Sequence, residues 1–439
     1  MRNLFILPSV VLLLSGTLDG SAQTTYFPPL VGSTWQTSDP AALGWCTDQL
    51  LPLHDFLATS NSKAFIVLKD GRIAIEWYYG SFTQDSLWYW ASAGKSVTAF
   101  LVGKAQEEGF LSISDSTSHY LGAGWTSCTP AQEGAITVRD QLAMISGLDD
   151  GVPDLDCTDP ICLNYLADPG TRWAYHNAPY TLLDGVIANA TGQTLNAYLN
   201  AKLNATIGLG GLYFPIGSNN VLISKPRGMA RFGLMMMAGG SWNGSPIMSD
   251  AAYFQDMITP SQSLNNAYGY LWWLNGQSSY MLPGFQLVLP GPLMPNAPLD
   301  AFNAMGRNGQ VINVSPSQGL VVVRMGDLPG GIFVPNVYND QIWQYLNAVI
   351  CAGTGVDEQL LGGLELFPNP ATDLVDVHLS GAHGPGVLTI ADGLGRIMRS
   401  ERLTGDHLQI DVSGLPGGCY MVSFRGERAV FTGRFVKQQ

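Results

Sequence analysis

The spacing of hydrophobic residues predicts both strands and helices in the first part of the chain. Ala64–Leu68 and Ile73–Trp77 are apolar runs rich in strand-forming residues, and Lys69-Asp70-Gly71 predicts a hairpin turn between them. From Ser92 the apolar residues recur at helical spacing, and Gly109 predicts the end of that helix. The apolar positions are Val97, Phe100, Leu101 and Ala105.

Further helices and a late hairpin are predicted in the same way. The longer helices are Ala41–Ala58, Leu182–Ala190, Arg227–Ala238 and Gln341–Ile350, and a shorter one is capped by Thr137, carries Val138, Leu142 and Ile145, and ends at Gly147. The strands are Asn303–Val314 and Leu320–Met325, with a turn at Pro316–Gly319. Strands at both ends of this region, with helices between them, predict an α/β layout whose sheet joins strands distant in the sequence.

Composition divides the chain into segments. Residues 1–22 carry an early arginine, an apolar stretch and small residues, which predicts a secretory signal peptide. Residues 23–39 form an extension rich in Pro, Thr and Ser, and residues 40–351 form the main domain. Residues 352–363 predict a linker, and in residues 364–439 short apolar runs alternate with turn signals, as in a small β-sandwich.

Charge and cysteine content narrow the class of protein. The formal net charge of −13 argues against nucleic acid and anionic membranes as partners. No apolar segment after the signal peptide is long enough to span a bilayer, so no transmembrane segment is expected in the mature chain. The six cysteines lack zinc spacing, and we expect no metal or cofactor. Connectivity is not readable from spacing; Cys157–Cys162 and Cys46–Cys351 are hypotheses for an exported protein.

Ser92-Ala93-Gly94-Lys95 carries the most specific chemistry. Residues three apart share a helix face, so the Lys95 amine can reach the Ser92 hydroxyl and act as its base if the ammonium is destabilised. Two other interpretations are a phosphate-binding loop and a solvated helix face. A phosphate-binding loop is disfavoured because Tyr89 stands where that loop needs glycine. The rest of the chain decides between a solvated helix face and a catalytic pair.

Two other clusters carry suitable groups. In Tyr175-His176-Asn177, a phenol can serve as acid or base, and an amide can orient a lysine or donate to a substrate carbonyl. Gly306-Arg307-Asn308-Gly309-Gln310 is placed on the first strand of the late hairpin, where small residues leave room for substrate and Arg307 suits a carboxylate. Taken alone, these clusters equally fit a turn with a helix cap and a tight bulge with a solvated arginine.

In this order and spacing, the three clusters resemble the S-x-x-K, Y-x-N and K-T-G motifs of the serine β-lactamase and penicillin-binding protein family. The likeness is greatest to class C β-lactamases, family VIII esterases and D-alanyl-D-alanine peptidases, and it covers residues 43–351. Ile136–Leu142 and Ser146–Leu148 also resemble that family's helix before its second motif. The resemblance implies an antiparallel sheet flanked by helices, with a helical subdomain.

The resemblance also implies roles for residues. Ser92 is the expected acylated nucleophile, Lys95 the proton acceptor, and Tyr175 a partner in base chemistry that activates water for deacylation. Asn177 is expected to orient Lys95 and the substrate. Arg307, Asn308, Gly309 and Gln310 are expected to bind substrate, with the backbone N–H groups of Ser92 and Gln310 forming the oxyanion hole. Arg307 and Asn308 depart from the family's lysine or histidine and threonine, which weakens the expectation of efficient β-lactam hydrolysis.

These features predict an exported serine hydrolase that acts on small esters or amides, peptidoglycan fragments included. Esterase, peptidase and β-lactamase activity are not separated by the sequence. The alternative is a catalytically silent surface or peptidoglycan-binding protein on the same scaffold. It is motivated by the departure at Arg307-Asn308.

The C-terminal segment resembles the sorting domain of type IX secretion. The matching stretches are Leu366–Pro370, Asp392–Arg396, Gly418–Tyr420 and Gly433–Lys437. The resemblance implies an outer-membrane secretion machinery as partner, and a secreted or surface location in a Gram-negative bacterium. A carbohydrate-binding or spacer sandwich is the other interpretation.

The histidines, an acidic stretch and a tryptophan pair of the main domain carry weaker signals for a site. The histidines His54, His119 and His176 lack metal spacing, and no G-x-S-x-G motif exists, so a Ser-His-Asp triad is not expected. The acidic stretch Asp149–Asp159 lacks the pattern of a calcium loop and is interpreted as a solvated loop. Trp272-Trp273 is interpreted as core.

Overall fold

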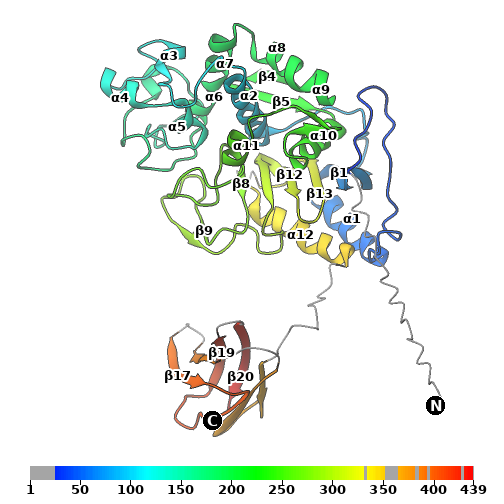
Figure 1. Cartoon of the computed structure of the whole chain (residues 1–439), viewed down its shortest axis with the longest axis vertical. Coiled ribbons are helices and arrows are strands. Elements are labelled where there is room, and N and C mark those ends of the chain that lie inside the picture. The colour runs from blue at the N-terminus through cyan, green and yellow to red at the C-terminus, as the bar shows by residue number, and fades with distance from the viewer. Residues whose placement is uncertain are drawn as a thin grey trace, which may run out of the picture. The chain divides into compact units, whose positions relative to one another are not determined.

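The computed structural model describes residues 25–330, 334–351, 364–380, 385–392, 396–426 and 430–438. The predicted signal peptide and the predicted linker at 352–363 lie outside these residues. The chain divides into two compact units, Met1–Cys351 and Ala352–Gln439, each with its own hydrophobic core (Figure 1).

A six-stranded antiparallel sheet forms the centre of the first unit, with the strand order β2-β1-β13-β12-β11-β8. The strands are β1 (Ser62–Lys69), β2 (Arg72–Tyr78), β8 (Trp273–Leu274), β11 (Phe302–Gly306), β12 (Gln310–Ser315) and β13 (Leu320–Gly326). The pairing of β1 with β13 joins strands from the two ends of the unit. The predicted antiparallel sheet, built from distant strands, is therefore confirmed.

Helices cover both faces of this sheet. In β13, Val321 and Arg324 differ in parity and so point to opposite faces. Helix α10 (Pro226–Met237) lies on the Val321 face, so close that a Cβ at Gly233 would come within 2.5 Å of that valine. Arg324 faces Tyr338 of α12 (Asn336–Ile350), which packs with α1 (Leu50–Thr59). The sheet is thus the middle layer of three (Figure 1).

The first unit also contains helices and short strands outside these layers. Helices α2 (Lys95–Glu107) and α7 (Leu183–Thr191) contact each other, and a helical subdomain packs on a small core made by Trp125, Ile136, Leu148, Leu163 and Ala178. The remaining helices are η1 (Thr47–Gln49), η2 (Ala91–Gly94), α3 (Ser118–Leu121), α4 (Pro130–Ala135), α5 (Val138–Leu142), η3 (Pro160–Cys162), α6 (Asn177–Thr181), α8 (Leu195–Leu199), η4 (Asn200–Asn204), α9 (Ala205–Ile207), α11 (Ala251–Met257) and η5 (Arg307–Gly309). The remaining strands are β3 (Trp88–Tyr89), β4 (Leu212–Ile216), β5 (Asn219–Ser224), β6 (Ser241–Trp242), β7 (Ser245–Pro246), β9 (Ser279–Tyr280) and β10 (Leu289–Pro290).

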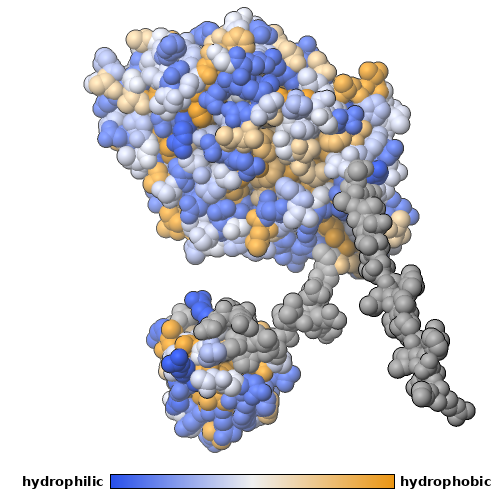
Figure 2. Space-filling view, viewed as in Figure 1, coloured by the Kyte–Doolittle hydropathy of each residue, from blue (hydrophilic) through white to orange (hydrophobic). Residues whose placement is uncertain are grey.

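Most apolar side chains of the first unit are buried in one continuous core. On the face seen in Figure 2, hydrophilic side chains are interspersed with smaller hydrophobic groups. Burial of this apolar area supplies the main driving force for folding of the unit.

Four predicted elements differ from the structure. The helix predicted over 341–350 begins earlier, at Asn336. The helix predicted over 41–58 begins only at Leu50, because Gly44 adopts φ +77° and ends a preceding turn. The helix capped by Thr137 ends at Leu142, before Ile145. The strand predicted over 303–314 is two strands, since Asn308 (φ 63°) and Gly309 (φ 83°) reverse the chain between β11 and β12.

Both hypothesised disulfides are formed. Cys46–Cys351 joins the segment before η1 to the end of α12 and closes the first unit covalently. Cys157–Cys162 closes a short ring in the loop between α5 and α6.

The second unit has two antiparallel sheets around its own core. One sheet contains β14 (Leu364–Phe367), β15 (Leu374–Leu379) and β18 (His407–Asp411), and the other contains β16 (Gly386–Ala391), β17 (Ile397–Leu403), β19 (Gly418–Gly426) and β20 (Val430–Lys437). In β15 the buried residues alternate with more exposed ones, as expected for a strand with one face in a core. The predicted β-rich domain is confirmed.

Arg324 fixes the turn between β11 and β12. This buried guanidinium donates to the carbonyl oxygens of Asn308 (2.7 Å), Gly309 (3.1 Å) and Ser60 (2.7 Å) and to the hydroxyl of Ser62 (3.0 Å). A planar fork is needed to reach all four acceptors, and a lysine ammonium cannot replace it.

Replacement of Arg324 by lysine is therefore expected to lower the free energy of unfolding of the first unit by about 2–4 kcal/mol, because buried carbonyl oxygens lose their donors. Urea unfolding followed by tryptophan fluorescence measures this. Arg172→Lys is the matched control, since a lysine there can keep the ion pair with Asp150. Equal stability of the two variants would contradict the role given to Arg324.

Candidate active site

Ser92 lies on the 3₁₀ turn η2, directly before α2. Buried Trp90 anchors this turn: its backbone N–H donates to Leu222 O at 2.8 Å and its indole N–H donates to Ser224 Oγ at 2.8 Å. From the other side, β11 approaches so closely that a Cβ at Gly306 would come within 2.3 Å of Trp90 O and 3.1 Å of Ser92 N. Glycine is therefore required at position 306, and the nucleophile candidate is held against the sheet.

Lys95 is buried beside this serine. Its Nζ donates to Ser92 Oγ at 3.3 Å, and only 5% of the residue is exposed. Burial lowers the pKa of Lys95 to about 7, although the negative charges of Asp156 and Asp184 oppose the shift. Near neutral pH a large fraction of this amine is unprotonated, as a general base requires.

Aromatic rings enclose the lysine. Its Nζ lies 4.1 Å from the centre of the Tyr180 ring and 5.4 Å from that of Tyr175. The Tyr175 ring stacks on Trp273 with the ring centres 5.8 Å apart, and Tyr175 lines the same cavity as Ser92. Burial raises the pKa of Tyr175 far above its usual value, so its phenol is protonated at neutral pH.

Asn177 begins α6 and reaches the same place from the helical subdomain. Its Nδ2 donates to Asp156 Oδ1 at 2.7 Å. Its Oδ1 is buried without a hydrogen-bond partner. The amide is therefore held by a residue of the acidic loop.

The third predicted cluster forms the turn between β11 and β12, not the strand edge that its pattern suggested. Arg307 is exposed and Asn308 Nδ2 donates to Tyr89 Oη at 2.9 Å. Gln310 is fully buried, and its side-chain amide bonds the backbone of Gly326 on β13 through both ends. Its side chain therefore braces the sheet.

One cavity of about 330 Å³ brings most of these residues together. Ser92, Lys95, Tyr175, Asn177 and Arg307 line it. The other lining residues are Tyr89, Ala91, Leu155, Asp156, Tyr180, Ile216, Asn219, Asn220, Val221, Pro283 and Val334. Asn308, Gly309 and Gln310 are not among them. The volume fits a small organic ligand.

Several residues around the cavity were missed by reasoning from the sequence. Asp184 on α7 is partly buried and accepts from Asn220 Nδ2 at 2.8 Å, and desolvation raises its pKa to about 7. Asp156 lies in a stretch interpreted as a solvated loop. Trp273 was rightly expected in the core, but its contact with Tyr175 comes from strand pairing that no local pattern shows.

The ring of the histidine in the second cluster has no hydrogen-bond partner. His176 is buried, both its ring nitrogens lack hydrogen-bond partners, and burial lowers its pKa to about 4. A neutral ring at physiological pH results. Over the described ranges, no group of three or more His, Cys, Asp or Glu side chains is placed to hold a metal ion.

Comparisons with known proteins support the same family. Residues 59–346 match the family model described as Beta-lactamase, and residues 365–438 match the Secretion system C-terminal sorting domain. The curated proteins contain no match to this sequence. Where the structure describes the chain, no helix is both long and apolar enough to cross a membrane.

Three solved structures have a similar fold. A protein proposed to be a 6-aminohexanoate-dimer hydrolase from Bacillus anthracis has a TM-score of 0.55 at 17% identity, over 74% of this chain and 88% of that one. A proposed β-lactamase from Bacteroides dorei has a TM-score of 0.54 at 18% identity, over 70% of this chain and 99% of that one. A family VIII carboxylesterase has a TM-score of 0.51 at 16% identity, over 69% of this chain and 98% of that one. At such low identity these structures establish the fold alone.

The C-terminal match marks the chain for type IX secretion to the cell surface or beyond. Since the family model spans the sheet, Ser92, Lys95 and the turn before β12, this chain belongs to the β-lactamase family of serine hydrolase-like proteins.

Proposed function

We propose that this protein is an exported serine hydrolase that acts through an acyl-enzyme on Ser92. The observation that carries the proposal is the buried Lys95 amine, 3.3 Å from Ser92 Oγ, with its pKa lowered to about 7. An unprotonated amine in this position can accept the serine proton at neutral pH.

In the acylation step, Ser92 Oγ attacks the substrate carbonyl carbon while Lys95 Nζ takes the hydroxyl proton. Tyr175, whose phenol stays protonated, passes a proton to the departing alkoxide or amine and regains one from the Lys95 ammonium. The bond to the leaving group breaks and a serine ester forms. Water then attacks the ester carbonyl and gives a proton to Lys95 through the Tyr175 hydroxyl. The bond from the carbonyl carbon to Ser92 Oγ breaks, the Lys95 ammonium returns the proton to that oxygen, and the acid is released.

The backbone N–H groups of Ser92 and Gln310 are assigned to the oxyanion. The close approach of β11 to η2 at Gly306 supports this assignment, because it sets the start of β12 beside the nucleophile turn. Loss of one such donor typically costs about 10²–10³ in rate. Asn177 is assigned to positioning, and Arg307 to a substrate carboxylate at the cavity rim.

The substrate class is a small ester or amide with an apolar part. Leu155, Ile216, Val221, Pro283 and Val334 supply apolar walls to a cavity of about 330 Å³. The structural relatives include a carboxylesterase and a protein proposed to be a 6-aminohexanoate-dimer hydrolase, so ester and amide substrates both belong in the test. A peptidoglycan fragment is a larger amide candidate for the same site.

Export follows from the C-terminal unit. We assign it to the outer-membrane secretion machinery as partner, on the match of residues 365–438. A catalytically silent binding protein is the rival function, and Arg307-Asn308, which departs from the family's third motif, is what favours it.

Labelling with a fluorophosphonate tests the nucleophile. We expect a covalent adduct on Ser92 in the wild-type protein and none in Ser92→Ala, as read by peptide mass spectrometry. Ser114→Ala, an exposed serine outside the cavity, is the matched control and is expected to label fully. A folded wild-type protein without an adduct, which binds substrate-like ligands equally well as Ser92→Ala, would establish the silent rival.

The pH dependence tests the base. Because only unprotonated Lys95 accepts a proton, kcat/KM for a p-nitrophenyl ester is expected to rise as pH increases through about 7 and then level off. Tyr175→Phe is expected to lower the plateau by about 10²–10⁴ without moving that rise. A rise centred near the usual pKa of lysine would contradict the proposed role of Lys95.

A further inference from the structure

The loop between α5 and α6 forms one wall of the proposed active site. Leu155 and Asp156 of this loop line the cavity with Ser92 and Lys95. Leu155 O accepts from Ala178 N at 3.0 Å, which ties the loop to the first turn of α6. Asp156 bonds Asn177, the residue before Ala178. The loop and the second motif therefore form one connected structure.

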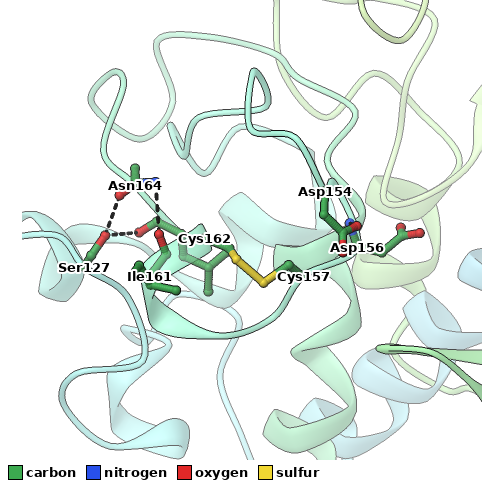
Figure 3. The surroundings of a disulfide bond; sticks show 8 residues. Ser127, Asp154, Asp156, Cys157, Ile161, Cys162 and Asn164 are labelled. Atoms are coloured by element: carbon green, nitrogen blue, oxygen red, sulfur yellow. Dashed lines mark hydrogen bonds between the residues drawn. A yellow bond between two sulfur atoms is a disulfide. The ribbon is translucent and has the colours of Figure 1, made fainter.

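A disulfide ring holds this wall. Cys157 follows Asp156 directly and is bridged to Cys162, and Asp156 N donates to Asp154 Oδ1 at 3.0 Å. Figure 3 shows the bridge between the two aspartates on one side and Ser127, Ile161 and Asn164 on the other. Ser127 Oγ donates to Asn164 Oδ1 at 2.7 Å and to Leu163 O at 3.1 Å, which fixes the far end of the ring. A loop closed in this way loses little further freedom when substrate binds.

The bond from Asn177 to Asp156 decides which way the amide faces. An ionised carboxylate only accepts hydrogen bonds, so the NH₂ group of Asn177 must point to Asp156. The amide oxygen then points away, and it is buried and lacks a partner. One N–H of this amide is engaged by Asp156, and the amide oxygen is oriented as an acceptor.

Asp156 also acts on Lys95 through its charge. Burial lowers the pKa of the lysine, and the carboxylates of Asp156 and Asp184 both raise it. The Ser92 hydroxyl and the rings of Tyr175 and Tyr180 also face the amine, and the guanidinium of Arg307 lines the same cavity. The loop carboxylate is thus one of two negative charges that oppose the desolvation of Lys95.

We propose that Asp156, presented by the Cys157–Cys162 ring on the same cavity wall as Lys95, is a positioning residue that orients the Asn177 amide and contributes a negative charge to the surroundings of Lys95. This rests on the proposed hydrolase function. Its two effects depend on different properties of the side chain: the orientation needs an acceptor atom, and the electrostatic effect needs a negative charge.

Two substitutions separate these properties. Asp156→Asn keeps an acceptor oxygen for Asn177 but removes the charge. The alkaline plateau of kcat/KM is expected to stay near that of the wild type, while the rise with pH moves to lower pH, because the pKa of Lys95 falls when the carboxylate is lost. Asp156→Ala removes both properties, so the plateau is also expected to fall, by about 10²-fold or less.

Asp159→Asn is the matched control, because it makes the same charge change in the same ring at an exposed residue that caps η3 without a side-chain bond. We expect this variant to change neither the plateau of kcat/KM nor the pH at which kcat/KM rises. The Cys157→Ser/Cys162→Ser double variant is expected to lower the plateau as Asp156→Ala does. If that variant keeps the wild-type plateau of kcat/KM, the disulfide ring is not needed to position Asp156.

Nitrogen-15 NMR titration of Lys95 gives a measurement that needs no turnover. The pKa of Lys95 is expected to be lower in Asp156→Asn than in the wild type and unchanged in Asp159→Asn. Identical Lys95 titrations in all three proteins, or equal plateaus for Asp156→Ala and wild type, would overturn the proposal. Absence of any Ser92 adduct in the wild type would instead refute the hydrolase function, while the titration still decides the role of Asp156.

Discussion

Burial of one amine beside one hydroxyl is the constraint on which the site depends. Lysine is strongly hydrated, and enclosing Lys95 among Tyr175, Tyr180 and the start of α2 destabilises its charged form. Packing of α2 in the large apolar core offsets the unfavourable free energy of burying this amine. In return the amine can serve as a base near neutral pH, 3.3 Å from Ser92 Oγ.

The fold fixes this pair from three directions. Trp90 anchors the nucleophile turn to β5, and Gly306 lets β11 approach that turn to within contact distance. Arg324 holds the chain reversal that follows β11. From the opposite side, α6 and the disulfide-closed loop bring Asn177 and Asp156 to the cavity. The site therefore depends on the packing of sequence-distant segments rather than on one local motif.

Local signals in the sequence predicted the parts of the molecule whose structure depends on nearby residues. The hairpin around Asp70-Gly71, the helices after Ser92 and Leu182, and the alternation in the C-terminal strands follow from short-range periodicity and turn chemistry. The Asn308-Gly309 pair is itself a hairpin signal, which the prediction of one continuous strand overlooked. Hydrogen bonds from Arg324 on a neighbouring strand to the carbonyl oxygens of both residues stabilise the reversal. Asp156 was missed for a different reason. Its acidic neighbours suggested a solvated loop, and its bond to Asn177 depends on how the subdomain folds.

Much of the Lys95 amine is unprotonated at neutral pH because burial in the folded chain lowers its pKa to about 7. Nitrogen-15 NMR titration of Lys95 in the intact wild-type protein tests this directly, with the resonance assigned by its absence in Lys95→Met. The account predicts a midpoint near pH 7. A midpoint near the ordinary lysine value of about 10.4 would show that the amine stays charged and would contradict the account.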